Sequence, residues 1–142
     1  MNLDEKENTK LTEDEIVELL MQHLVSQSWT IESFCLGQQR GYDIVATRSG
    51  KRLYVEAKGA KASDNSPTKK RKFFDSGQIK DHFGKALVKS LETKIKYPNA
   101  LVAIAHPDDI DIRRAIGSTV AFLDKIGIMH FWVGRKSIQL VE

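Results

Sequence analysis

The chain has 142 residues, of which 41% are hydrophobic and 29% are charged, so it can bury the core of one domain. One cysteine, Cys35, excludes an intrachain disulfide, and no run is apolar enough to predict a membrane span. The net charge of +3 permits a nucleic-acid partner, and the acidic start lacks the features of a secretory signal. We therefore expect a cytoplasmic protein, associated with the nucleoid or, in a eukaryote, located in the nucleus.

The first segment of the chain predicts a tail and then a helix. Residues 1–10 are polar and are expected to be a flexible tail, and residues 11–142 are expected to form a single domain. Thr12 and Glu15 have the spacing of a capping box, which predicts the start of a helix. The apolar residues that recur at helical spacing are Ile16, Val17, Leu20 and Leu24.

Three predicted strands and a long loop follow. The runs 29–37, 42–48 and 51–59 are rich in strand-forming residues and close together, so they predict an antiparallel meander. Segment 60–75 has no apolar periodicity and contains a dense basic cluster. It therefore predicts a basic loop without regular structure.

The second half of the chain predicts two helices, a central strand and a hairpin. One helix begins near Ser76, and another follows Pro107 and ends at Gly127. The residues expected to be buried are Ile79, Phe83, Ala86, Leu87 and Leu91 in the first and Ile112, Ile116, Val120 and Leu123 in the second. The continuously apolar run 100–105 is typical of a strand covered on both faces, and 128–141 predicts the hairpin. The order αβββαβα and then a β-hairpin predicts an α/β fold with a mixed sheet flanked by helices.

Two acids, Asp43 and Glu56, interrupt the apolar runs of the second and third predicted strands. A two-residue turn at Ser49 and Gly50 gives a register in which facing residues have numbers that add to 99. The two carboxylates then face each other on one side, with β-carbons roughly 4.5 to 5.5 Å apart. Lys58 points to the same side because strand side chains alternate. The opposite side receives Ile44, Ala46, Leu53, Val55 and Ala57.

Two interpretations of the paired acids remain open at this point. Like charges that face each other destabilise a sheet, so a divalent cation such as Mg²⁺ would offset the repulsion. Lys58 could then orient or deprotonate an attacking water, or neutralise charge on a phosphate. The alternative is an exposed strand face on which Lys58 and other basic residues screen the acids.

The arrangement of Asp43, a spacer of 12 residues, and then Glu56, Ala57 and Lys58 resembles the PD-(D/E)XK nuclease superfamily, the fold of many restriction endonucleases and junction resolvases. The resemblance covers roughly residues 11–133 and implies a restriction-endonuclease-like fold. It also implies Asp43 and Glu56 as metal ligands, the Ala57 carbonyl as a third ligand, and Lys58 as the catalytic lysine. Mg²⁺ is the implied cofactor, with Mn²⁺ as the expected substitute.

One departure from the superfamily pattern is Tyr42, which stands where the motif has its proline. Several members carry a further acid on the first helix, and Glu18 is the best match because Glu15 belongs to the capping box. The alternative for Glu18 is a solvated helix position.

Polar residues on the second predicted helix form a stripe beside its buried side. The stripe consists of Gln78, His82, Lys85 and Lys89. It could follow a phosphate backbone, and the superfamily often uses a glutamine at this point, for which Gln78 is the match. A solvated helix face is the alternative.

The basic loop is the expected DNA clamp, because it leaves directly from the Lys58 end of the third strand. Its phosphate-contacting residues are expected to be Lys61, Lys69, Lys70, Arg71 and Lys72. The same run also looks like a nuclear-import signal. Phe73 and Phe74 could stack on bases, although anchoring the loop to the core is favoured. His106 and His130 are expected to be structural, since no His/Cys spacing indicates zinc.

The leading hypothesis is a Mg²⁺-dependent nuclease that hydrolyses phosphodiester bonds in DNA, with endonuclease favoured over exonuclease. The alternatives are a non-catalytic nucleic-acid-binding module and a subunit of a restriction or repair complex. A homodimer would let two sites act on two strands, and no membrane partner is expected.

Overall fold

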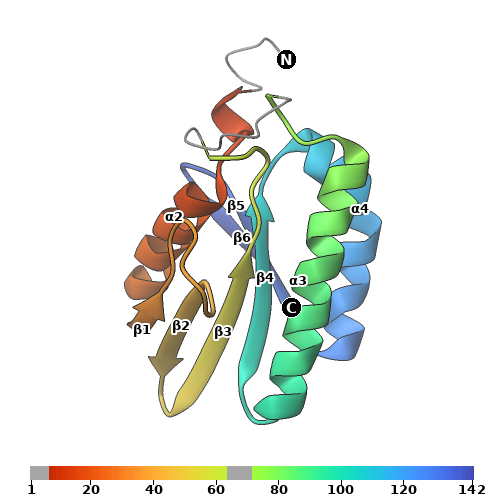
Figure 1. Ribbon diagram of the computed structural model, residues 1–142. Helices are drawn as coiled ribbons and strands as arrows, with labels where there is room; N and C mark the ends of the chain where they lie inside the picture. Colours follow the sequence, from red (N-terminus) through yellow and green to blue (C-terminus); the bar gives the residue numbers. More distant parts are fainter. Residues whose placement is uncertain (1–6, 64–71) are drawn as a thin grey trace.

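The computed structural model describes residues 7–63 and 72–142 (Figure 1). The elements, in chain order, are α2 (Glu13–Ser26), β1 (Thr30–Phe34), β2 (Ile44–Arg48), β3 (Lys51–Ala57), α3 (Ser76–Lys96), β4 (Leu101–Pro107), α4 (Ile110–Leu123), the 3₁₀ helix η1 (Asp124–Ile126), β5 (Met129–Val133) and β6 (Ile138–Val141). This is the predicted order of helices and strands, which is therefore confirmed.

The six strands form one mixed sheet in the order β1-β2-β3-β4-β5-β6. Strands β1 to β3 are antiparallel, β4 pairs in parallel with both β3 and β5, and β6 returns antiparallel to β5. Helix α2 covers one face, and α3 and α4 lie together on the other (Figure 1). The protein is therefore an α/β domain with helices on both faces of its sheet, as expected.

Helix α2 begins at the predicted capping box. The backbone N–H of Glu15 donates to Thr12 Oγ1 at 3.2 Å, and the N–H of Thr12 donates to Glu15 Oε1 at 3.0 Å. The apolar side of the helix packs on the sheet, and its four predicted core residues, Ile16, Val17, Leu20 and Leu24, are all buried. The capping box thus predicted where this helix starts, and the apolar periodicity predicted which side it buries.

The β2–β3 hairpin has the predicted turn and register. Ser49 and Gly50 have φ angles of 52° and 78°, the left-handed pair that matches the twist of a two-residue hairpin. Arg48 pairs with Lys51, and the same register continues to Ile44 and Val55. The apolar residues of this hairpin lie in the core beneath α2, as predicted.

Helix α3 differs from the prediction in the side that it buries. Ile79, Phe83 and Ala86 are buried as expected, but Leu91 is 39% exposed. The buried side continues instead through Ser90 and Thr93, which keep the helical spacing from Ala86. Leu91 lies about 100° further around the helix than Ser90, so the prediction for Leu91 is wrong.

Residues 7–10, predicted as part of a flexible tail, lie against the domain. Lys10 is only 1% exposed, and its Nζ lies 2.7 Å from Asp109 Oδ2 and 2.6 Å from Asp111 Oδ2 at the start of α4. Asp109 also caps α4 by accepting hydrogen bonds from the N–H groups of Asp111 and Ile112. A buried ammonium paired with two carboxylates holds residues 7–10 against the domain, so the tail boundary predicted at residue 10 is wrong.

The two central histidines lie inside the α3–α4 side of the sheet. Both His106 and His130 are buried, and their rings are joined by a hydrogen bond of 2.9 Å between Nδ1 and Nε2. Burial lowers the pKa of His106 well below its ordinary value and that of His130 to about 3, so both rings are neutral. Their predicted structural placement is confirmed. Within the described residues, no helix is long and apolar enough to cross a membrane.

Candidate functional site

The carboxylates of Asp43 and Glu56 lie together at one end of the β2–β3 hairpin. Asp43 directly precedes β2, and its Oδ2 accepts a hydrogen bond of 2.8 Å from the backbone N–H of Ala57. Glu56 lies within β3, and the charge of Asp43 acts on its carboxylate. The two acids therefore face each other as the predicted register requires. Their roles as metal ligands, like that of the Ala57 carbonyl, stay predictions.

A third carboxylate, Glu13, joins this pair from the first turn of α2. The charges of both Asp43 and Glu56 act on it. Glu18, which the sequence indicated as the acid of the first helix, is exposed and borders a separate hollow with Met21 on the outer surface of α2. The prediction of Glu18 as a site residue is therefore wrong.

Gly59 explains why Glu13 reaches the site. A β-carbon at Gly59 would lie 2.6 Å from the backbone nitrogen of Glu13, closer than atoms can approach. The glycine thus lets the chain after β3 pass directly against the start of α2, where the N–H of Ala60 donates to Leu11 O at 2.8 Å. A glycine directly after Lys58 is the sequence signal for this close approach. It indicates which turn of the helix contributes the acid.

The crowding of carboxylates perturbs their protonation. Burial, followed by the charge of Asp43, raises the pKa of Glu56 to about 7. Burial, followed by the charges of Asp43 and Glu56, raises the pKa of Glu13 to about 7, although Lys58 opposes the shift. Near neutral pH the cluster is therefore close to the point at which it exchanges a proton.

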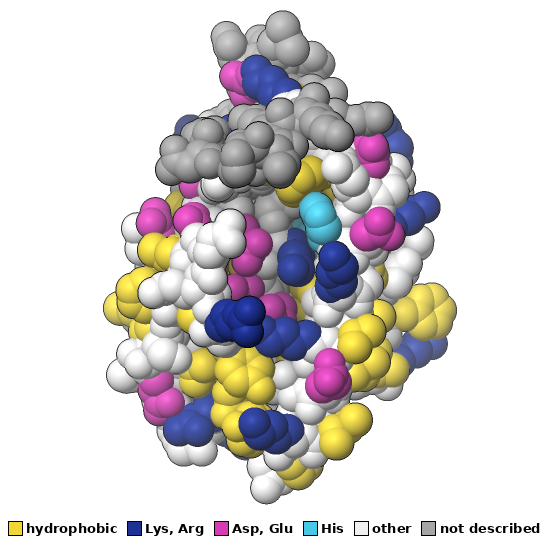
Figure 2. Space-filling view, viewed as in Figure 1, with side chains coloured by type: hydrophobic (Ala, Val, Ile, Leu, Met, Phe, Trp, Pro, Cys, Tyr) yellow, Lys and Arg dark blue, Asp and Glu magenta, His cyan; other side chains and the backbone are white. Residues whose placement is uncertain are grey.

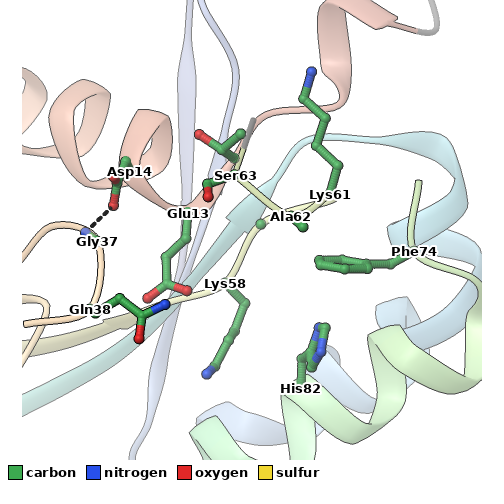
Figure 3. A pocket seen from close by; sticks show the side chains of 12 residues that line it. Glu13, Asp14, Gly37, Gln38, Lys58, Lys61, Ala62, Ser63, Phe74 and His82 are labelled. Carbon is green, nitrogen blue, oxygen red and sulfur yellow. Dashed lines mark hydrogen bonds between the residues drawn. The ribbon is translucent and has the colours of Figure 1, made fainter. Parts of the chain in front are cut away.

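Lys58 and Glu13 lie on the wall of a pocket of about 280 Å³ (Figure 3). Glu13 and Lys58 extend into this pocket from two sides, and His82 of α3 faces them from a third. Burial and then the charge of Lys58 lower the pKa of His82, so its ring is biased toward the neutral form. The pocket is lined by Thr12, Glu13, Asp14, Gly37, Gln38, Lys58, Gly59, Lys61, Ala62, Ser63, Phe74 and His82.

The loop between β1 and β2 closes another side of the pocket. The N–H of Gly37 donates to Asp14 Oδ1 at 2.9 Å, which holds the loop against α2 (Figure 3). Gln38 lies beside Glu13 and extends toward the pocket. No sequence pattern predicts the position of this loop, because it depends on a contact between segments far apart in the chain.

The residues of the predicted polar stripe on α3 make different contacts. Gln78 completes the cap of the helix, since its Oε1 accepts from the N–H of Asp75 at 3.0 Å, and its predicted phosphate contact stays a prediction. Lys89 turns toward the acids: its Nζ lies 2.9 Å from Glu56 Oε1 and donates to Gly41 O at 2.8 Å. Lys85 is exposed.

Of the predicted basic loop, the structure describes residues 60–63 and 72–75. Lys69, Lys70 and Arg71 lie outside the described residues, so their prediction as DNA contacts stays a prediction. Lys72 is exposed and forms an ion pair with Glu7. Phe74 packs against the core and meets the ring of His82 edge-on at 4.5 Å between centroids, which confirms its anchoring role.

The face of the molecule that carries the site has a marked charge pattern. Acidic side chains occupy its middle, and Lys and Arg side chains border them (Figure 2). Lys58, Lys61, Lys85 and Lys89 contribute to this border or to the pocket itself. The arrangement can therefore combine a cation held by the acids with a polyanion held by the lysines.

Comparisons with known proteins show a similarity at the level of structure. No model of a known protein family matches the chain, and no curated protein matches it in sequence. Its structure is similar to that of an XisH family protein from Nostoc punctiforme PCC 73102, with a TM-score of 0.53. The alignment covers 89% of this chain and 98% of that one, at 15% sequence identity. The likeness shows a shared fold. The domain described here is thus a known α/β architecture, a mixed sheet flanked by helices.

Proposed function

We propose that the protein is a metal-dependent nuclease that hydrolyses phosphodiester bonds in DNA, acting as an endonuclease. The observation that carries the proposal is the convergence of Glu13, Asp43 and Glu56 with Lys58 beside a pocket at the end of β3. Three carboxylates that repel one another destabilise the fold, so the cluster requires a reason other than stability. The resemblance to the PD-(D/E)XK superfamily and the fold shared with an XisH family protein are consistent with it.

The donor set fits Mg²⁺. The site offers carboxylate oxygens and a backbone carbonyl, the hard ligands that this ion prefers, from Asp43, Glu56 and Ala57. Buried Glu56 Oε1 accepts no well-directed hydrogen bond from the described residues, although Lys89 Nζ lies 2.9 Å away. Among the described residues, no three His, Cys, Asp or Glu side chains are grouped so that they could hold a metal ion by themselves. Water and the phosphate would therefore complete the coordination.

The residues of the chain have separate roles in the proposed reaction. A bound Mg²⁺ would polarise the scissile phosphate and lower the pKa of a water at the site. Lys58 would neutralise the negative charge that develops on the phosphate, or hold the attacking water. Glu13, whose carboxylate lies close enough to feel the charges of Asp43 and Glu56, would accept a proton from that water. Lys61, Lys72 and Lys85 would contact the DNA backbone along the border of the site.

A second candidate function is a non-catalytic nucleic-acid-binding module, or a subunit of a restriction or repair complex with the same fold. The ion pair between Lys89 and Glu56 favours it, because a lysine 2.9 Å from the carboxylate neutralises the charge that a metal would otherwise neutralise. The nuclease proposal requires Lys89 to leave Glu56 when the metal binds.

The experiment is a cleavage assay on linear, circular, branched and single-stranded DNA, with Mg²⁺, Mn²⁺ or EDTA. The nuclease proposal predicts cleavage that requires the metal and is lost in Lys58→Ala. That variant should keep its metal affinity, measured by calorimetry, because the lysine is not a ligand. DNA binding without cleavage of any substrate would favour the binding module.

A further inference from the structure

Helix α3 carries an apolar seam on the side that faces away from the sheet. Val88 is 57% exposed, Leu91 is 39% exposed and Ile95 is 82% exposed. With Gly84 they follow the spacing i, i+4, i+7, i+11, the alternation of a and d positions in a coiled coil. Hydrophobic side chains appear along the lower half of α3, with an acidic side chain among them (Figure 2). The seam therefore has the pattern of a helix–helix contact.

Gly84 is unusual for its place in the helix. Glycine in a helix interior is destabilising relative to alanine, so a glycine there normally relieves a close contact. A β-carbon at Gly84 would meet nothing within 4 Å among the described residues. No contact among the described residues therefore requires that position 84 lack a side chain. The close approach of a helix from another molecule would require it, because small residues allow two helices to pack closely.

The charges beside the seam are self-complementary. Lys85 and Glu92 lie two turns apart on the same flank of the seam, in the e positions of this heptad. An antiparallel pairing in which Val88 faces Leu91 of a second copy brings Lys85 of each molecule near Glu92 of the other. It also places Ile95, the most exposed apolar residue of the seam, over Gly84. Asp81 and Lys96 come together further along the same flank.

We propose that α3 is a homodimer interface in which two copies of this chain pair antiparallel through the seam Gly84, Val88, Leu91 and Ile95. A parallel pairing would leave Ile95 facing Ile95 and Gly84 facing Gly84, with an empty layer at one end. It would also place like charges together, since Lys85 at an e position would lie near Lys80, a g position, of the other copy. The antiparallel arrangement is favoured because Ile95 then packs over Gly84 and Lys85 lies near Glu92 of the other copy. The proposal does not depend on nuclease activity.

A single pair of helices is a small interface, so association in the micromolar range is expected. Sedimentation velocity over a range of protein concentrations measures the dimer dissociation constant. Ile95→Glu should weaken the dimer at least tenfold. Val25→Glu is the matched control, since Val25 is 58% exposed on α2 and should leave the constant unchanged. A parent protein that stays monomeric at several hundred micromolar, or a dimer that tolerates Ile95→Glu, overturns the proposal.

Two further variants test the register. Lys85→Glu or Glu92→Lys alone should weaken the dimer roughly tenfold, since each replaces two attractions by two repulsions, and the double exchange should restore it. Gly84→Gln should raise the melting temperature of the monomer through better helix propensity while weakening the dimer. Single charge variants that are not rescued by the double exchange would rule out the antiparallel register. Equal dimerisation by Gly84→Gln would rule out the close approach.

Discussion

Replacing Glu13 with glutamine should stabilise the metal-free protein, because it removes one charge from a cluster of three acids. Burial and then the charges of Asp43 and Glu56 raise the pKa of Glu13 from 4.5 to about 7. A carboxyl whose pKa is higher in the folded state binds its proton more tightly there than in the unfolded chain. Its contribution to the free energy of unfolding is therefore most favourable below pH 4.5. That contribution falls as the pH rises toward 7 and is least favourable above pH 7.

The pKa shift sets the size of the effect. A rise from 4.5 to about 7 corresponds to roughly 3 kcal/mol at most. Glu13 is partly exposed, and solvent screening reduces the gain, so we expect Glu13→Gln to raise the free energy of unfolding by about 1 to 2 kcal/mol at pH 8. For a domain of this size, that is a rise of roughly 3 to 8 °C in melting temperature.

Thermal denaturation followed by circular dichroism, in EDTA at pH 8 and at pH 6, measures this gain. The matched control is Glu18→Gln, the same change at an exposed position of the same helix. The melting temperature should rise in Glu13→Gln and not in Glu18→Gln, and the rise should be smaller at pH 6 than at pH 8. A melting temperature that Glu13→Gln leaves unchanged or lowers at pH 8, or an equal gain from Glu18→Gln, refutes the assignment of Glu13 to the acid cluster.

Three other predictions concern the core and the basic loop. Lys10→Ala should cost about 3 to 5 kcal/mol in urea unfolding, because it leaves two carboxylates near the start of α4 without their buried cation, whereas exposed Lys136→Ala should cost almost nothing. Equal stability of the two variants would show that the buried pair is not stabilising. The lowered pKa of His130, about 3, means that unfolding takes up a proton below about pH 6.5. From pH 8 to pH 5 the parent should therefore lose about 2 kcal/mol more stability than His130→Gln, and identical pH profiles would contradict the buried neutral ring. Alanine at all four positions of 69–72 should weaken DNA binding across sequences and flatten its salt dependence, measured by fluorescence anisotropy. Unchanged affinity and slope would assign the cluster to transport or solubility.

Local patterns predicted most of the fold. The capping box at Thr12, the turn at Ser49 and Gly50 and the apolar run of β4 each act through neighbouring residues, so the order of elements and the hairpin register follow from them. The register in turn brought Asp43 and Glu56 together, because a turn of fixed length leaves one pairing that also buries the apolar side.

The errors have a common physical origin in contacts between distant segments. Helical periodicity could not tell which acid of α2 meets β3, since that depends on the close approach that Gly59 permits. It could not show that Lys10 is buried, because its partners lie about 100 residues away in α4. Helix α3 has a second, exposed apolar side that includes Leu91. The sequence of the helix alone does not show which of its apolar sides meets the sheet, so Leu91 was assigned to the core.

The most direct test of the central claim is cleavage of plasmid DNA in Mg²⁺ by the parent protein and by Asp43→Asn, measured alongside DNA binding by both. The variant keeps the size of the side chain but removes a charge from the proposed metal site. We expect cleavage by the parent and at least a hundredfold loss in the variant, with DNA binding retained or tightened, since one carboxylate no longer repels the phosphates. A parent that cleaves no nucleic acid with Mg²⁺ or Mn²⁺, or equal cleavage by both proteins, would contradict the claim that these acids form a nuclease site.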